Sequence, residues 1–311
     1  MKLIFCGTPQ FAVPALERLL VKPFEVELVV TNPDEPSGRG YEVKFPAVKR
    51  AALDAGLVLF QPSRLKDPFA RGLLSQFRPD VIVVVAYGHI IPGWMIELPR
   101  LGCINLHASL LPKYRGAAPI PWAIMRAEQV TGVTTMKIDE GLDTGDILLQ
   151  REIEIRPDDT AETLGARMSL AGAELMGETL ERLCRGELRG RPQDHARATL
   201  APMLKKEDGR IDWSLSAAEI ERRVRGLRPW PGAFTLFRQK HLHLWTASVA
   251  GKASRAEEPG TLAAGNGKLR VACGDAVELE LLEVQLEGRR RLSGSDFLNG
   301  VHLQGGERLG S

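Results

Sequence analysis

The side chains best suited to chemistry lie close together in residues 105–116. An amide (Asn105), an imidazole (His107) and a hydroxyl (Ser109) alternate there, directly after an apolar run. If this segment ends a strand, Asn105 and His107 point to the same face, because side chains alternate along a strand. A neutral hydrogen-bond donor beside a titratable ring suits chemistry at a carbonyl carbon, where one group stabilises an oxyanion and the other handles a proton.

A second candidate is the loop 141–146, which reads Gly-Leu-Asp-Thr-Gly-Asp. Two glycines bracket Asp143, and because glycine permits positive φ we expect them to aim its carboxylate at a fixed point. Taken alone, the loop also fits an ordinary turn in which Asp143 or Asp146 caps the backbone. Beside Asn105 and His107, the carboxylate would orient the imidazole and favour its charged form.

Three other motifs are weaker. Ser109 lacks the G-x-S-x-G elbow of a serine nucleophile and lies only two residues from His107. The turn 7–9 follows a strand but lacks the remaining glycines of a dinucleotide fingerprint, so a tight strand–helix turn is the simpler interpretation. His241 and His243 alternate on a predicted strand without nearby Cys or carboxylate partners, which favours a solvent-facing strand over a metal site.

The first half of the chain alternates strands with helices. Strands are predicted at 2–6, 26–31, 58–60 and 80–86, and helices at 11–20, 46–55 and 67–77, with a loop at 32–41. This alternation is typical of a Rossmann-like, doubly wound α/β sheet, and such sheets bind ligands at the carboxyl ends of their strands. The candidate strand ends at residues 87–88 and 105–107 would therefore lie together. A hairpin (131–138 with 146–155) and a long helix (160–185) follow.

The second half has a different pattern. Residues 186–202 are rich in Arg, Gly and Pro, and after a helix at 216–227 short strands are predicted at 233–237, 241–246, 260–262, 269–273 and 277–284. Several short strands with Gly turns indicate a small OB-like β-barrel. We therefore predict a catalytic domain over 1–188, a linker over 189–207 and a barrel domain over 208–311.

Composition narrows the class of protein. The 311 residues are 44% hydrophobic and carry a formal net charge of +2. Four dispersed cysteines form no metal-ligand or disulfide pattern, so we expect no metal and a cytoplasmic location. No apolar run is long enough to span a membrane. Residues 189–240 carry a local charge of +6, and Arg289, Arg290 and Arg291 form another basic cluster. Two basic clusters in one half favour a polyanionic partner over a merely solvated face.

The chain resembles the formyltransferases that use 10-formyltetrahydrofolate. The resemblance rests on Gly-Cys-Ile-Asn-Leu-His at 102–107, Ser-Leu-Leu-Pro at 109–112, Arg-Gly-Ala-Ala-Pro-Ile at 115–120 and the acidic loop at 141–146. Segments 5–9, 33–40, 83–88, 209–214, 229–233 and 296–300 extend it, nearly end to end, toward the branch of the family that formylates initiator methionyl-tRNA.

The resemblance implies residue roles. The family's catalytic residues fall on Asn105, His107 and Asp143, and its acceptor-stem loop on 32–45, with Arg39 as the basic residue. Its folate-binding segments fall on Val85, Ala86, Tyr87 and Gly88 and on Ser109, Leu110, Leu111 and Pro112. The C-terminal barrel would present Lys205, Lys206, Arg222, Arg223 and Arg225 to the tRNA. The implied reaction moves a formyl group from 10-formyltetrahydrofolate, as co-substrate, to the α-amine of methionyl-initiator tRNA, giving N-formylmethionyl-tRNA for translation initiation by a monomeric, metal-free enzyme.

Three rivals remain at this point. A formyltransferase of the same fold that acts on an amino sugar nucleotide or another small amine would share Asn105, His107 and Asp143 but would not need the basic second half. A non-catalytic RNA-binding protein would not need the cluster of these three residues. A nicotinamide dehydrogenase is disfavoured by the incomplete glycine fingerprint.

Overall fold

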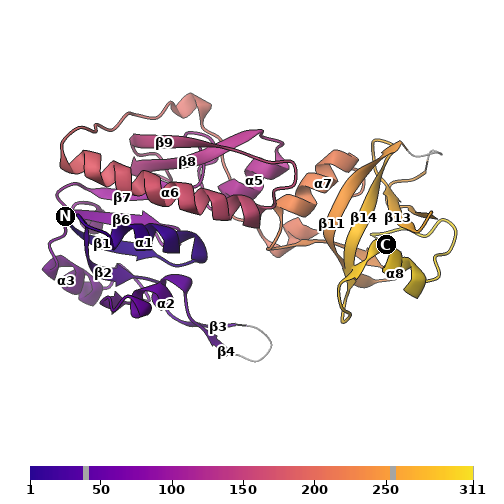
Figure 1. Ribbon diagram of the computed structural model, residues 1–311, viewed down its shortest axis with the longest axis horizontal. Coiled ribbons are helices and arrows are strands. Elements are labelled where there is room, and N and C mark those ends of the chain that lie inside the picture. Colours follow the sequence, from indigo (N-terminus) through magenta and orange to yellow (C-terminus); the bar gives the residue numbers. More distant parts are fainter. Residues whose placement is uncertain (38–41, 253–256, 311) are drawn as a thin grey trace. The chain divides into compact units, whose positions relative to one another are not determined.

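The computed structural model describes residues 1–37, 42–252 and 257–310. The chain forms two compact units, each with its own core. The first comprises residues 1–119, 130–154 and 165–201, and the second comprises 120–129, 155–164 and 202–311. Figure 1 labels the elements along the chain.

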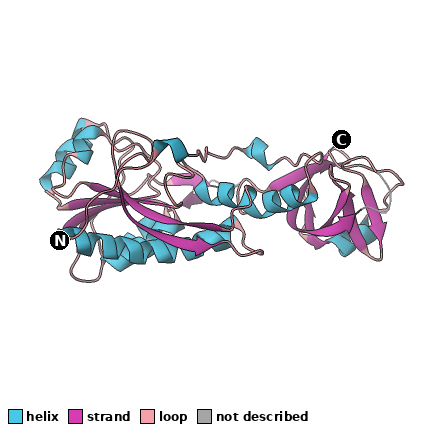
Figure 2. Cartoon of the chain, turned by 90° about the horizontal axis from the view of Figure 1, so that it is seen from above, coloured by secondary structure: helices cyan, strands magenta, loops and turns pink. Residues whose placement is uncertain are grey.

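The first unit is built on a seven-stranded sheet of order β5-β2-β1-β6-β7-β8-β9. The first five strands in that order are parallel, whereas β8 pairs antiparallel with β7 and with β9. The strand bounds are β1 Lys2–Gly7, β2 Glu25–Val30, β5 Leu59–Phe60, β6 Val81–Val85, β7 Cys103–His107, β8 Val130–Lys137 and β9 Ile147–Glu154. Helices lie on both faces of this sheet (Figure 2), as the alternating pattern predicts.

The central strand β6 shows why the sheet forms. All five of its residues, Val-Ile-Val-Val-Val, are buried, so it needs apolar side chains on both faces. It pairs with β1 on one side and with β7 on the other, with Val84 opposite Asn105 and Val85 opposite Leu106. The end of β6 therefore lies beside the end of β7, and the two candidate segments at these strand ends are neighbours.

The helices follow the predicted positions closely. The bounds are α1 Val13–Leu19, preceded by the 3₁₀ turn η1 Gln10–Ala12, α2 Ala47–Asp54, α3 Pro68–Gln76 and α6 Ala161–Cys184. Asp67 caps α3 by accepting from the Phe69 N–H at 2.9 Å, and Pro68 occupies its first position. The short helices α4 Gly93–Ile96 and α5 Pro119–Met125 were not predicted, because four to seven residues carry too little apolar periodicity.

The predicted loop at 32–41 is partly wrong. Glu35–Ser37 (β3) pairs antiparallel with Glu42–Lys44 (β4), which makes a hairpin. The Pro and Gly residues of this stretch favour a loop in the sequence pattern, so they conceal the two short strands. Arg39 falls at residues 38–41, outside the described part of the chain.

The second unit carries an antiparallel sheet of order β10-β11-β14-β13-β12, with β15 paired to β14. Its strands are β10 Ala233–Phe237, β11 Lys240–Lys252, β12 Leu262–Gly265, β13 Lys268–Ala272, β14 Val277–Leu286 and β15 Leu292–Ser293. The unit also contains the helices α7 Ala217–Gly226 and α8 Gly294–Gly300 and the 3₁₀ turn η3 Lys206–Gly209. The strand predicted at 260–262 begins two residues later than expected. Within its mainly apolar core, the buried indole N–H of Trp213 donates to the buried Thr235 Oγ1 at 3.0 Å.

The segment between the two sheets is ordered rather than featureless. Residues 165–201 group with the first unit, and η2 (His195–Arg197) is capped by Asp194. The division at residues 188 and 208 stays a prediction. Within the described residues, no helix has both the length and the apolarity needed to cross a membrane.

Candidate active site

Strand β7 carries the first two candidates into the sheet edge where ligands bind in parallel α/β folds. Asn105 lies opposite Met136 and His107 opposite Thr134 on β8. Asn105 is half-buried and His107 is buried, whereas Cys103 and Ile104 are in the core. Two residues apart on one strand, the amide and the imidazole lie on the same face, as the sequence predicts.

The imidazole of His107 lies between two oxygen atoms. Nε2 is 2.9 Å from the carbonyl oxygen of Tyr114, and Nδ1 is 3.7 Å from Asp143 Oδ2. Because a carbonyl can only accept, Nε2 carries a proton and donates to it. Nδ1 is therefore the nitrogen that remains for a reacting group, and it faces the carboxylate. The structure thus brings His107 and Asp143 together across 36 positions of sequence.

Asp143 has an unusual backbone conformation. Its φ is +52°, in the left-handed region that a non-glycine residue seldom adopts, and its Oδ2 accepts from the Gly116 N–H at 2.8 Å. The expectation that the flanking glycines supply the positive φ is wrong. Gly145 is required for space instead, because a Cβ there would lie 1.9 Å from the Lys137 carbonyl oxygen.

A buried network fixes this loop from behind. Gln193 Nε2 donates to the carbonyl oxygens of Asp143 and Gly145, both at 2.8 Å. Gln193 Oε1 in turn accepts from Nε and Nη2 of Arg115 at 3.1 and 2.7 Å. Arg115 is only 7% exposed, and its Nη2 also donates to His195 Nδ1 at 3.2 Å. The guanidinium and the amide therefore act as one clamp on the acidic loop.

The turn 109–112 is held by its own hydrogen bonds. Ser109 is fully buried and its hydroxyl donates to the Lys113 carbonyl at 2.6 Å, so it is not placed as a nucleophile beside His107. Thr134 Oγ1 donates to the Ser109 carbonyl at 2.6 Å and accepts from the Leu111 N–H at 3.2 Å. Gln150 Nε2 donates to the Leu111 carbonyl at 2.9 Å. Ser109 therefore stabilises the conformation of the turn.

The neighbouring segment 85–88 alternates in exposure. Val85 and Tyr87 are buried, whereas Ala86 and Gly88 are exposed and have φ of +46° and +87°. The Tyr87 phenol has no hydrogen-bond partner among the described residues, and burial, followed by the nearby Cys6, raises its pKa. A ligand at this edge would thus meet the backbone at 86 and 88 rather than the phenol.

The predicted RNA-binding residues differ in their surroundings. Lys205 and Lys206 are exposed. Arg222 donates to the Met125 carbonyl at 3.4 Å, and Arg225 pairs with Glu221 and donates to the Asp159 carbonyl at 2.7 Å. Arg223 is half-buried on α7. Lys205 and Lys206 are therefore accessible to solvent, whereas Arg222 and Arg225 also form hydrogen bonds within the protein.

Sequence reasoning gave no role to several residues that build this site. These are the Tyr114 carbonyl, the Gly116 N–H, Arg115, Gln193 and Thr199, whose hydroxyl accepts from the Tyr114 N–H at 2.8 Å. Backbone contributions leave no trace in residue type. Gln193 lies in the Arg- and Pro-rich stretch, where nothing in the pattern separates it from its neighbours.

The fold and this site define a class of protein. The family model described as formyl transferase matches residues 1–180, and that of the formyl transferase C-terminal domain matches residues 203–302. The N-formyltransferase of Helicobacter canadensis, solved with folinic acid and dTDP-3-aminofucose, has a TM-score of 0.68 at 18% identity, covering 90% of this chain and 98% of that one. At this identity the likeness concerns the fold alone.

Full-length relatives are more specific. The methionyl-tRNA formyltransferase of Acidobacterium capsulatum is 55% identical over 312 residues, covering 100% of both chains. That of Koribacter versatilis is 54% identical, covering 100% of this chain and 99% of the relative. The chain belongs to the methionyl-tRNA formyltransferase family.

Proposed function

We propose that this protein transfers the formyl group of 10-formyltetrahydrofolate to the α-amine of methionine carried by initiator tRNA. The observation that carries the proposal is the approach of His107 Nδ1 to Asp143 Oδ2, at 3.7 Å, on the face of β7 that also bears Asn105. The full-length likeness to methionyl-tRNA formyltransferases supports the choice of substrates.

The reaction forms one bond and breaks one. The neutral amine attacks the formyl carbon, its C–N bond forms, and the bond from that carbon to folate N10 breaks. The amine loses a proton and N10 gains one. Esterification lowers the basicity of the amine below that of a free α-amino group, whose pKa is about 7.7–8.0, so a large neutral fraction exists at physiological pH.

The three side chains have separate tasks in this scheme. The Asn105 amide and the Nδ1–H of a protonated His107 would donate to the oxyanion that develops on the formyl oxygen. The Asp143 carboxylate would stabilise the charged imidazole and, directly or through water, help to move the proton from the amine to N10. The Gly116 N–H and the Gln193 clamp keep that carboxylate in place.

The folate co-substrate would lie along the ends of β6 and β7. Ala86 and Gly88 expose their backbone there, and the missing Cβ of Gly88 leaves open space apart from the Asn32 amide at 3.8 Å. A flat pterin ring suits such an edge, since backbone N–H and carbonyl groups can pair with its polar rim. Leu110 and Pro112, both half-buried, would supply apolar contact from the neighbouring turn.

The test is formylation of methionylated initiator tRNA, methionylated elongator tRNA and small amines, including an amino sugar nucleotide, with a labelled formyl donor. We expect the label on the initiator tRNA alone. Transfer to the sugar nucleotide but not to the tRNA would replace this function with the small-amine alternative. No transfer to any acceptor would reject the enzyme assignment.

A further inference from the structure

The proposed reaction gives no specific task to two motifs of the sequence, which are the alternating pair His241 and His243 and the basic triplet 289–291. The structure brings them to one face of the second unit. His241, His243 and Trp245 lie on the outer face of β11, because Leu242 and Leu244 between them are buried in the core.

Four rings form this surface, which we call the ring face: Phe234, His241, His243 and Trp245. Phe234 of β10 lies directly opposite His243. Its ring stacks on that of His241, with centroids 4.9 Å apart and planes 21° from parallel, and it is tilted against His243 at 6.3 Å. His241, the other member of the stack, is exposed.

Arginines lie against the same face. The Arg291 guanidinium carbon is 3.7 Å from the centroid of the Trp245 ring, and that of Arg228 is 5.9 Å from it. Gln285 connects this region to the basic turn: its Oε1 accepts from the Trp245 indole N–H at 3.0 Å, and its Nε2 donates to the Arg289 carbonyl at 2.9 Å.

The charge around the rings is positive. The basic residues are Arg228, Arg289, Arg290 and Arg291. The acidic residues beside them are Glu283, which is 3.7 Å from Arg291, and Glu287, which accepts from the His241 N–H at 3.3 Å. Burial, followed by the proximity of His241, lowers the pKa of His243 from its ordinary value, so this ring is neutral at physiological pH.

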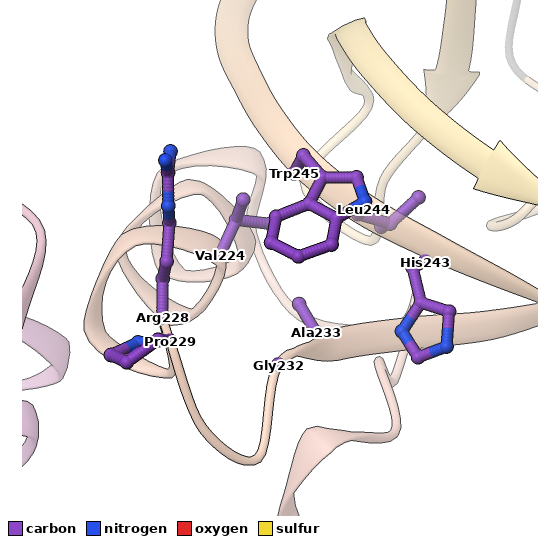
Figure 3. A pocket seen from close by; sticks show the side chains of 8 residues that line it. All are labelled: Val224, Arg228, Pro229, Gly232, Ala233, His243, Leu244 and Trp245. Atoms are coloured by element: carbon purple, nitrogen blue, oxygen red, sulfur yellow. The ribbon is translucent and has the colours of Figure 1, made fainter. Parts of the chain in front are cut away.

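We propose that the ring face binds an unpaired nucleotide of the RNA substrate, with a base stacked on His241 or Arg291 and the flanking phosphates on Arg228 and the 289–291 turn. Exposed aromatic and guanidinium planes beside arginines are the combination with which proteins bind single-stranded RNA. The inference rests on the proposed function, which supplies an RNA as the occupant. The hollow between His243, Trp245 and Arg228 (Figure 3) is small, about 20 Å³, so we place the base outside it.

The experiment measures binding of the full chain to a single-stranded RNA octamer that carries one 2-aminopurine, whose fluorescence is quenched by stacking. We expect quenching by the wild type and roughly tenfold weaker binding by the double variant His241→Ala/Arg291→Ala. His241→Phe keeps a plane and should bind as the wild type does. Lys268→Ala, a cation on β13 paired with Glu280, is the matched control and should change nothing.

Equal binding by the double variant, or no quenching by the wild type, would overturn the proposal. So would binding of an acidic peptide to this face when the RNA octamer does not bind, since the partner would then be a protein. Formylation of initiator tRNA separates the two proposals. If the double variant keeps its kcat and its KM for tRNA, the ring face fails and the proposed function stands. If the wild type formylates no tRNA, the proposed function fails whatever the octamer does.

Discussion

At the scale of single residues, the proposed chemistry uses side chains that the sequence identifies and backbone atoms that it does not. Asn105, His107 and Asp143 could be proposed from residue type and spacing, because an amide, an imidazole and a carboxylate are the groups that acyl transfer needs. The structure adds that His107 uses Nε2 for the Tyr114 carbonyl, which leaves Nδ1 for the reaction that we propose. Residue type does not indicate which backbone carbonyl a side chain contacts, so this contact is evident only in the folded structure.

Removing the predicted oxyanion donor tests the central role. Asn105→Ala should lower kcat/KM for tRNA formylation while the protein stays folded. The expected loss of transition-state stabilisation is about 2.7–4 kcal/mol, the usual cost of one oxyanion donor. Asp143→Asn, which can still accept from the Gly116 N–H, should lose activity through the missing charge alone. Steady-state kinetics with circular dichroism as a folding check measure both. Near-wild-type turnover by Asn105→Ala would reject the oxyanion role.

The Gln193 clamp makes a sharper prediction about positioning. Gln193→Glu keeps an oxygen for Arg115 but loses both donated hydrogen bonds to the acidic loop. We expect kcat to fall by roughly 10²-fold, with little change in KM for tRNA, because a displacement of about 1 Å is enough for such a loss. Gln76→Glu, an exposed position at the end of α3, is the charge-matched control. A rise in KM without a fall in kcat would assign Gln193 to substrate binding.

At the scale of elements, regular structure was predictable where the apolar pattern was long. Strand β6, with five buried residues, and helix α6, with 24 residues, lie where the periodicity places them. The β3–β4 hairpin and helix α5 were missed, because strands of three residues and a helix of seven carry too few positions for a pattern. The acidic loop was correctly located, but its glycines serve a different purpose from the expected one.

That difference can be tested in the loop itself. Gly145→Ala would place a Cβ 1.9 Å from a backbone oxygen, so the loop must shift and carry Asp143 with it. We expect a fall in kcat/KM of roughly 10²-fold. Gly72→Ala in α3, where a Cβ meets nothing within 4 Å, should leave activity unchanged and stabilise the protein by about 0.5–1 kcal/mol. Equal effects of the two substitutions in activity assays and thermal melts would contradict this account.

Helix α7 offers a prediction about pH. Ser216 Oγ accepts from the Glu219 N–H at 3.3 Å and donates to the Glu219 carboxylate at 2.6 Å, and this hydrogen bond lowers the pKa of Glu219. A lowered folded-state pKa stabilises the fold above the unfolded-state value, and the contribution is lost as pH falls through the folded-state pKa. Ser216→Ala should therefore cost about 1 kcal/mol at pH 7 and less at pH 3.

Urea unfolding at both pH values measures the difference. Ser248→Ala, in the middle of β11, serves as the control, since a half-buried strand serine without a capping role should change little at either pH. A cost of Ser216→Ala that is equal at pH 7 and pH 3 would show that the carboxylate takes no part in the cap.

At the scale of the whole molecule, the two units carry different candidate sites. The first unit holds Asn105, His107 and Asp143, and the second holds the exposed Lys205 and Lys206. RNA affinity should fall steeply with salt, because bound phosphates release counterions. Lys205→Ala and Lys206→Ala should each weaken tRNA binding and reduce the slope of log K against log salt by about 1.

Arg225→Ala should instead act mainly on stability, because its guanidinium pairs with Glu221 and the Asp159 carbonyl. Filter binding over a salt series, together with thermal melts, distinguishes the two effects. A flat salt response of the wild type would contradict a role of Lys205 and Lys206 in binding RNA phosphates.

The hydrogen bonds of Gln193 also bear on how this chain can be recombined with others. Composition suggests a junction near residue 189, yet Gln193, whose side chain donates to the backbone carbonyl of Asp143, lies four residues beyond it. In a chimera joined at residue 189, Gln193 would come from one parent chain and Arg115, which donates to it, from the other. A chimera that exchanges residues 202–311 should therefore be joined after residue 201, so that Arg115 and Gln193 come from the same parent chain.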